Sequence, residues 1–141
     1  MPLTSEPDLH LLVNGIRLDA VTRTPSVSVF TLDSGSATVR LCSRAAVPQE
    51  FGTARDPRCL GVGIRRIAVR QGTRFRVATA GDAGLTDGFH RFERETGLRW
   101  TDGDAALPAA LFAGFAGRME LVVDVGATTQ YADDGSASRA A

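Results

Sequence analysis

The chain has 141 residues, with 16 basic and 16 acidic side chains and a formal net charge of zero at pH 7. This length fits one domain with its own hydrophobic core, and a content of 43% hydrophobic and 23% charged residues is typical of globular proteins. The neutral balance argues against a nucleic-acid binder that depends on electrostatic attraction. The sequence also lacks an apolar run of the roughly 18 residues that a membrane span needs.

The N-terminal residues have neither the basic segment nor the long apolar segment of a secretory signal peptide. The first apolar run, 9–13, is short and contains His10. We therefore expect residues 1–8 to form an extension before the folded module and the protein to be cytoplasmic by default. The alternative is a location at the cell surface or outside the cell, if the protein belongs to an exported system.

A β-hairpin is predicted near the start of the chain. Segments 9–13 and 16–21 are rich in apolar residues and flank the dipeptide Asn14-Gly15. This dipeptide favours a two-residue turn because both of its residues tolerate positive φ. Along 16–21 the apolar and polar residues alternate, which indicates a strand with one buried face.

Further strands are predicted downstream because apolar residues recur with a period of two. Gly61 and Gly63 suggest a bulge or a close approach of the backbone in one of these strands. Residues 105–115 favour a short helix only weakly because Pro108 interrupts them, and residues 132–141 are polar and small, which predicts a disordered tail. The strands are expected over 26–32, 37–42, 60–69, 73–80 and 119–125.

Two irregular stretches interrupt this pattern. Between Ser43 and Leu60 the alternation is lost, which predicts a long connection that serves function or packs locally. Residues 85–104 are aromatic and charged. The many short strands at intervals of about 8–12 residues are typical of an antiparallel sandwich or barrel. We expect an all-β fold, an antiparallel, jelly-roll-like β-sandwich that forms a single domain over residues 9–131.

The residue types exclude several kinds of chemistry. His10 and His90 are the only histidines and lie far apart, without partners at ligand spacing, so we expect no metal site and no cofactor. No nucleophile elbow or phosphate-binding glycine loop is present, and we expect no enzymatic activity. The pairs Arg65-Arg66 and Arg74/Arg76 are interpreted as a solvated sheet face rather than a nucleic-acid site.

The two cysteines, Cys42 and Cys59, do not form a disulfide scaffold. Both lie beside predicted strands, so two buried thiols are the favoured interpretation. A single disulfide is the alternative, because the two strand-like segments could be neighbours.

Trp100 is the residue that most suggests a binding site. Beside Arg99 and Asp102 it could be a platform on which a sugar ring stacks, or it could anchor a loop from the core or its rim. Arg44, Asp56 and Arg58 pose a similar choice between lining a binding patch and pinning the long connection through an Arg–Asp pair. For Trp100 the favoured interpretation is that it anchors a loop. For the other three residues it is that they pin the long connection.

Several motifs resemble a β-sandwich module of bacterial proteins. Modules of this kind occur at the C-terminal end of proteins with a hedgehog/intein-type (Hint) autoprocessing domain, and looser versions accompany glycosyltransferases of surface-polysaccharide synthesis. The nucleophile and His-containing block of the autoprocessing domain are absent from this sequence, so the resemblance implies an accessory module. The motifs lie at 43–48, 56–62, 65–67, 86–90, Glu93, 99–105 and 107–108.

The resemblance implies a non-catalytic accessory or binding module that recognises bacterial surface glycan. The alternative is a structural module that self-associates or docks within a larger Hint-type protein without binding a ligand. The expected partners are thus a glycan or a protein, including a second copy of the chain, but neither nucleic acid nor membrane. The candidate ligand-binding residues are Arg44, Asp56, Arg58, His90, Glu93, Arg99, Trp100 and Asp102.

Overall fold

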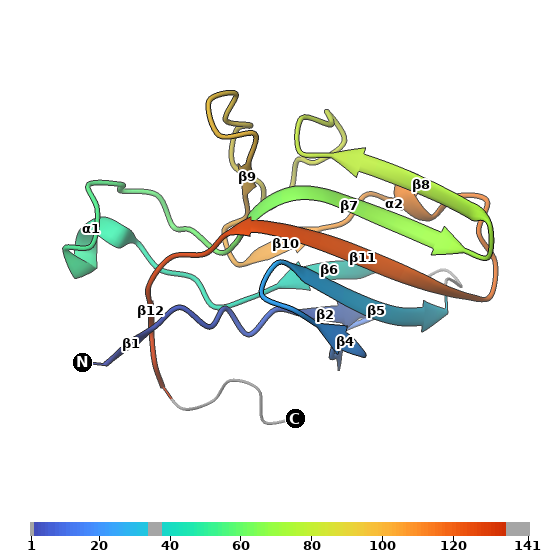
Figure 1. The fold of residues 1–141 in the computed structure, drawn as a ribbon, viewed down its shortest axis with the longest axis horizontal. Helices are drawn as coiled ribbons and strands as arrows, with labels where there is room; N and C mark the ends of the chain where they lie inside the picture. The colour runs from blue at the N-terminus through green and yellow to red at the C-terminus, as the bar shows by residue number, and fades with distance from the viewer. Residues whose placement is uncertain (1, 34–37, 135–141) are drawn as a thin grey trace.

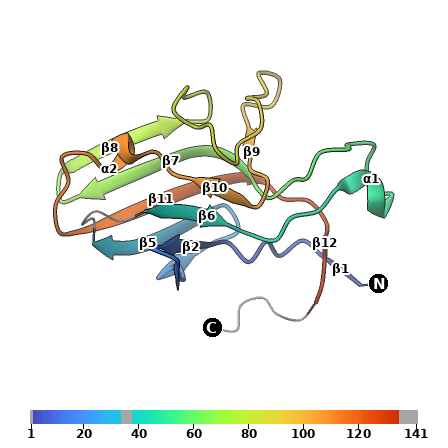
Figure 2. The ribbon, with the colours of Figure 1, turned by 180° about the vertical axis from the view of Figure 1, so that it is seen from behind.

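The computed structural model describes residues 2–33 and 38–134, which form antiparallel sheets with two short helices. Figures 1 and 2 show the fold from opposite sides. The elements in chain order are β1 (Leu3–Thr4), β2 (His10–Val13), β3 (Ile16–Leu18), β4 (Thr22–Arg23), β5 (Val27–Asp33), β6 (Val39–Cys42), α1 (Pro48–Phe51), β7 (Gly63–Gln71), β8 (Arg74–Thr79), β9 (Arg99–Trp100), β10 (Asp104–Ala106), α2 (Ala109–Phe112), β11 (Arg118–Ala127) and β12 (Tyr131–Ala132).

The predicted hairpin is confirmed in β2 and β3. Its turn residues Asn14 and Gly15 have φ angles of 51° and 80°, which is the backbone that a two-residue turn of this kind requires. Val13 pairs with Ile16 across the turn. Asn14 also accepts a hydrogen bond through its side-chain oxygen from the backbone N–H of Thr38, at 2.9 Å, which ties the turn to the chain entering β6.

Two sheets make up the sandwich. The four-stranded sheet has the order β10-β6-β2-β3, and the six-stranded sheet has the order β4-β5-β11-β7-β8 with β9 also paired to β7. From β3 through β5 and β6 to β7, and again from β8 through β10 to β11, the chain passes back and forth between the two sheets. This exchange confirms the expected antiparallel, jelly-roll-like sandwich.

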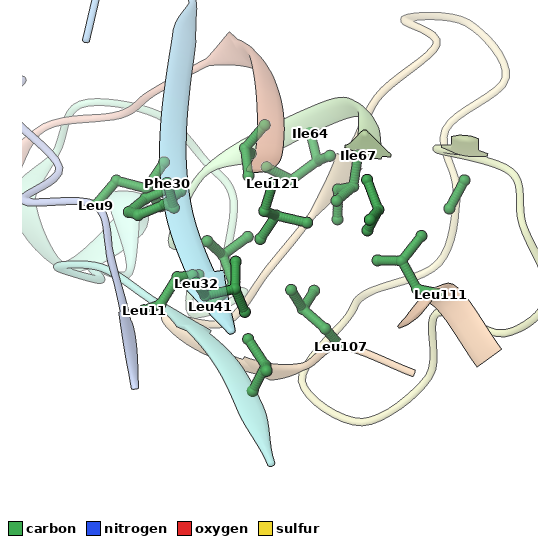
Figure 3. Packing of buried hydrophobic residues seen from close by; sticks show 14 of the residues in the cluster. Leu9, Leu11, Phe30, Leu32, Leu41, Ile64, Ile67, Leu107, Leu111 and Leu121 are labelled. Carbon is green, nitrogen blue, oxygen red and sulfur yellow. The ribbon is translucent and has the colours of Figure 1, made fainter. Parts of the chain in front are cut away.

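The hydrophobic core lies between the two sheets, as Figure 3 shows. The four-stranded sheet contributes Leu11 and Leu41, and the six-stranded sheet contributes Phe30, Ile67 and Leu121, each at most 1% exposed. Because side chains alternate across a strand, the intervening residues of β7 and β11 point away from the core and form the outer face of the six-stranded sheet. The alternation of apolar and polar residues that predicted these strands thus also decides which side chains face the core and which face outward.

The structure differs from the sequence prediction in its short elements. The long connection 43–60 contains α1, which begins at Pro48, ends at Phe51 and is followed by Gly52 with a φ of 71°. Proline suits the first turn of a helix, and glycine suits the left-handed residue after it. The weak helix expected over 105–115 shortens to α2, because residues 104–106 join the four-stranded sheet as β10.

The two ends of the described chain lie side by side. Strand β1 lies within the expected extension 1–8 and pairs with β12. The Arg44 side chain joins the same region, since its Nη1 donates to the Glu6 carbonyl at 3.0 Å and its Nη2 lies 3.3 Å from Asp134. Most of the tail expected at 132–141 lies outside the described residues, which end at 134.

Neither helix among the described residues is long and apolar enough to cross a membrane.

Gly61 and Gly63 allow the close backbone approach that the sequence suggested. A Cβ atom at Gly61 would lie 2.6 Å from the backbone nitrogen of Gly103, and one at Gly63 would lie 3.3 Å from the indole of Trp100. Backbone atoms cannot move aside as the end of a flexible side chain can. The contact at Gly61 therefore holds the start of β7 against the chain that follows β9.

We expect Gly61→Ala to lower the free energy of unfolding by about 1–3 kcal/mol, because the added methyl group overpacks a buried backbone contact. Gly81→Ala is the matched control, since its Cβ would make an ordinary contact of 3.6 Å with the Phe92 ring. Urea unfolding followed by circular dichroism measures both variants. Equal stability of the two variants would contradict the assigned contact.

Candidate functional site

The residues before β9 fold into an arm that leaves the sandwich, and Figure 1 shows it as the gold loop above β9. Two isolated bridges, Phe89 to Thr101 and Glu93 to Leu98, hold its two sides together. At its base Gly88 has a φ of 84°, and a Cβ there would lie 2.2 Å from the Asp104 carbonyl oxygen. Glycine is thus required where the arm approaches β10.

An arginine joins this arm to the long connection 43–60. The Arg58 guanidinium donates to both carboxylate oxygens of Asp56, with Nη2 at 2.7 Å from Oδ2, and the same Nη2 lies 2.9 Å from Glu93 Oε2. Glu93 in turn accepts a hydrogen bond from the Thr96 hydroxyl at 2.9 Å. Such bidentate charge-assisted pairs combine strength with a defined geometry. They bring together two segments that were predicted as separate irregular stretches.

The Arg58 contacts also set the ionisation of Asp56. Hydrogen bonding to the Arg58 side chain, opposed by partial burial, holds the pKa of the Asp56 carboxyl below its ordinary value. Hydrogen bonds to the carboxylates of Asp56 and then Glu93 raise the pKa of Arg58, opposed by partial burial. The Asp56–Arg58 pair is therefore ionised at neutral pH.

His90 and Asp102 lie next to this cluster through contacts with Cys59. The His90 Nε2 atom is 2.6 Å from the Cys59 carbonyl oxygen, and because a carbonyl only accepts, Nε2 carries the proton. The Cys59 thiol donates to the Asp102 carbonyl at 3.6 Å. The exposed Asp102 carboxylate accepts the backbone N–H of Asp104 at 2.9 Å and so closes a turn.

Arg99 and Trp100, which form β9, attach the arm to neighbouring parts of the fold. Arg99 donates from Nε to the His90 carbonyl at 2.9 Å and from Nη1 to the Asp82 carbonyl at 2.8 Å, so it ties two loops together. Trp100 is only 9% exposed and its indole packs over Gly63. With its ring covered, Trp100 presents no open face for stacking and has the position of a loop anchor.

A solvent-open depression of about 560 Å³ lies along the arm. Three of the predicted residues, Arg58, His90 and Glu93, line it, and Asp56 adjoins it through Arg58. Arg99, Trp100 and Asp102 are not in its lining, and Arg44 lies instead between the chain ends. The remaining lining residues are Arg91, Phe92, Arg94 and Glu95.

Phe92 is the aromatic residue at this surface, and the sequence interpretation overlooked it in favour of Trp100. Its ring is half-buried, with one side over Gly81. A phenylalanine flanked by Arg91 and Glu93, in a stretch without strand periodicity, is a sequence signal that could have indicated an exposed aromatic. We call the surface of Arg58, His90, Phe92 and Glu93 the arm site.

A second groove, of about 440 Å³, contains none of the predicted residues. It lies between the segment after β1 and strands β4 and β5, and the pair Arg23–Glu6 stands at its side with a separation of 3.4 Å. Its walls come from segments far apart in the chain, so no local motif could have indicated it. They comprise Thr4, Ser5, Glu6, Pro7, Leu9, Arg23, Thr24, Pro25, Ser28, Val125 and Thr128.

Comparisons with protein-family models, with curated proteins and with solved structures find no match for this chain. Among the described residues no group of three or more His, Cys, Asp or Glu side chains is placed to hold a metal ion.

Both cysteines are free thiols, in contrast to the disulfide alternative. Cys42 is buried as expected, whereas Cys59 is exposed, because it lies in the connection before the strand rather than within it. Burial, and then the nearby Asp104 carboxylate, raises the pKa of Cys42 to about 12. Burial is also the main cause that raises the pKa of Cys59.

We expect the Asp56→Asn variant to be less stable than the wild type by about 1 kcal/mol at pH 7. Because Arg58 stabilises the ionised carboxylate, this stability is present above the ordinary pKa of an aspartate and is lost as the pH falls through the lowered pKa of the folded state. The difference between the variants should therefore vanish in acid. Urea unfolding from pH 7 to pH 2 measures it, with Asp87→Asn at an exposed ion pair as the control.

A thiol-specific reagent should modify Cys59 in the native protein at least about tenfold faster than Cys42, because access limits the reaction of the buried thiol. The Cys59→Ser variant should then show only the slow phase, which becomes fast on unfolding. Modification of both thiols at the same fast rate in the native protein, or of neither thiol in the native or the unfolded state, would contradict this placement.

Proposed function

We propose that this protein is a non-catalytic binding module whose arm site recognises a neutral saccharide of a bacterial surface glycan. The observation that carries the proposal is the carboxylate–guanidinium–carboxylate chain of Asp56, Arg58 and Glu93 beside the partly open ring of Phe92. Sugar rings have polar edges and apolar faces. A ligand site that combines several fixed polar groups with an aromatic side chain suits such a ring.

The charges of the site favour a neutral ligand over an anionic one. The guanidinium groups of Arg58, Arg91 and Arg94 at the depression are balanced in number by the carboxylates of Asp56, Glu93 and Glu95, and Arg58 is already engaged by the first two of these. A phosphate or carboxylate ligand would have to compete with Asp56 and Glu93 for the same guanidinium. Sugar hydroxyls, which both donate and accept, can use the remaining donors and lone pairs without displacing either partner.

The non-catalytic part of the proposal is supported by how the titratable groups are engaged. His90 Nε2 is held by the Cys59 carbonyl, and the two Glu93 oxygens accept from Arg58 and Thr96. A general base would have to lie within hydrogen-bond reach of a substrate proton, and the contacts above already engage both candidate bases.

The resemblance to modules that accompany polysaccharide glycosyltransferases favours bacterial surface glycan as the ligand class.

Binding of neutral saccharides should depend on Phe92. We expect glycan arrays that carry bacterial surface polysaccharides to identify a ligand for the wild type, and calorimetric titration to show at least about tenfold weaker binding by Phe92→Ala, because the ring supplies the apolar contact. Ile16→Ala removes an exposed apolar side chain from β3, at the edge of the four-stranded sheet, and should bind as the wild type does.

Arg58→Gln provides a second test that retains the Phe92 side chain, and it should also weaken binding. Circular dichroism and thermal unfolding establish that each variant is folded. The proposal is wrong if the wild type binds no saccharide, or if folded Phe92→Ala and Arg58→Gln bind with unchanged affinity.

A further inference from the structure

The outer face of the six-stranded sheet carries an apolar row that runs across four strands. In the register of the sheet Val77 of β8 lies beside Ala68 of β7, Ala68 beside Val122 of β11, and Val122 beside Val29 of β5. Phe75 adjoins this row on β8. Most residues of a solvated outer face are polar in a sandwich with one buried side, so a continuous apolar row requires an explanation.

Exposure of this row increases towards the edge strand β8. Val29 is 9% exposed at one end, Val77 is 40% exposed at the other, and Phe75 is 72% exposed. Ala68 and Val122 between them are partly exposed. The exposure of the apolar side chains thus increases from β5 to β8, where the row ends at the projecting ring of Phe75.

Phe75 cannot turn into the core because its neighbours occupy the other side of β8. Arg74 and Arg76 lie over the Phe115 ring, 4.6 Å and 5.1 Å from its centre. Arg74 donates to the Gly114 carbonyl at 2.9 Å and Arg76 to the Ala110 carbonyl at 3.1 Å. Arg74 and Arg76 therefore lie on the side of β8 opposite to Phe75, and the strand register holds Phe75 outward.

Two ionic rows flank the apolar row. Arg66 pairs with Asp124 on one side, and Arg70 pairs with Glu120 at 2.7 Å on the other. In both rows the arginine is on β7 and the acid is on β11. In these two rows the basic side chains therefore lie on β7 and the acidic ones on β11, on either side of the line between the two strands. Arg118 at the start of β11 lies outside both rows, beside Asp33 of β5.

This arrangement is complementary to itself. Consider a two-fold axis that lies in the interface, parallel to the strands and between β7 and β11. It places β7 of one protomer over β11 of its partner, so arginines meet acids in both ionic rows while the apolar rows meet each other. The register along the strands is preserved, so Val77 and Phe75 of one copy come over β5 of the other.

We propose that the outer face of the six-stranded sheet binds a second copy of this chain, face to face, through such a two-fold axis. Interfaces of this isologous kind are the commonest in homo-oligomers. An apolar centre with an exposed aromatic anchor and charged groups around it is the usual anatomy of a protein interface. The inference is independent of the arm site, which lies on a different part of the chain and uses none of these residues.

The first test is the oligomeric state of the full chain. Light scattering after size exclusion, and sedimentation equilibrium, should give twice the chain mass of 14.9 kDa for the wild type. Phe75→Ser should raise the dissociation constant of the dimer about tenfold or more. The matched control is Ile16→Ser on β3, which removes an equally exposed apolar side chain, 73% against 72%, from the edge of the other sheet. Its dissociation constant should equal that of the wild type.

The second test uses the charge pattern. Arg66→Glu with Arg70→Glu makes both ionic rows acidic, and Glu120→Arg with Asp124→Arg makes both rows basic. Each double variant alone should be monomeric because like charges would meet across the axis, whereas an equimolar mixture should form a heterodimer. Adding Phe75→Ser to both should weaken that heterodimer, which separates docking through the apolar row from general charge attraction.

Several outcomes would overturn the inference. A monomeric wild type at millimolar concentration excludes the dimer, and binding of some other protein by that monomer would assign the face to a different partner. A dimer that survives Phe75→Ser and both charge variants, or that Ile16→Ser dissociates, uses another surface. A dimer that forms instead by strand pairing between the β8 edges of two copies would persist in each double charge variant on its own. Phe92→Ala should leave the dimer intact, so failure of saccharide binding and failure of dimerisation are separate results.

Discussion

The alternation of side chains along β11 is the constraint on which the other features of the molecule depend. This strand lies between β5 and β7, with antiparallel pairing on both sides. Its inward residues, such as Leu121 and Val123, are completely buried in the core. Its outward residues, such as Glu120 and Asp124, pair with arginines of β7. A one-residue slip of register would exchange the two faces, so burial of the apolar set determines the position of every outward charge.

The arm site depends on a different kind of interaction. Residues 53–62 and 89–98 include only short or isolated pairings, so ladder hydrogen bonds cannot hold them as they hold the sandwich. Arginine side chains join them instead: Arg58 bridges Asp56 and Glu93, and Arg99 reaches the carbonyls of neighbouring loops. The planar guanidinium has five donors and can serve several acceptors at once, which a lysine ammonium cannot do with the same geometry. The neutral charge balance of the chain thus partly reflects pairs that support irregular backbone.

Local patterns predicted most of the sandwich and less of the site. The Asn14-Gly15 turn and the alternation in β5, β7, β8 and β11 are properties of neighbouring residues, and each was predicted close to where the structure has it. Helix α1 and strand β1 were missed because they are short and depend on what lies beside them. Asp56, Arg58, His90 and Glu93 were predicted together and do lie together, whereas Arg44 belongs to the chain ends and Trp100 is covered.

The sequence by itself determined that this protein is an antiparallel β protein with a core of its own, because a period of two and turn residues act over a few neighbouring positions. Only the tertiary structure decided which charged and aromatic side chains meet. Arg58 and Glu93 are 35 residues apart, and they meet where the chain beside Gly61 and Gly63 packs closely against the residues around Trp100. The choice of Phe92 over Trp100 as the aromatic of the arm site has the same origin. Burial depends on which segment covers a ring, and the identity of that segment is a property of the folded chain.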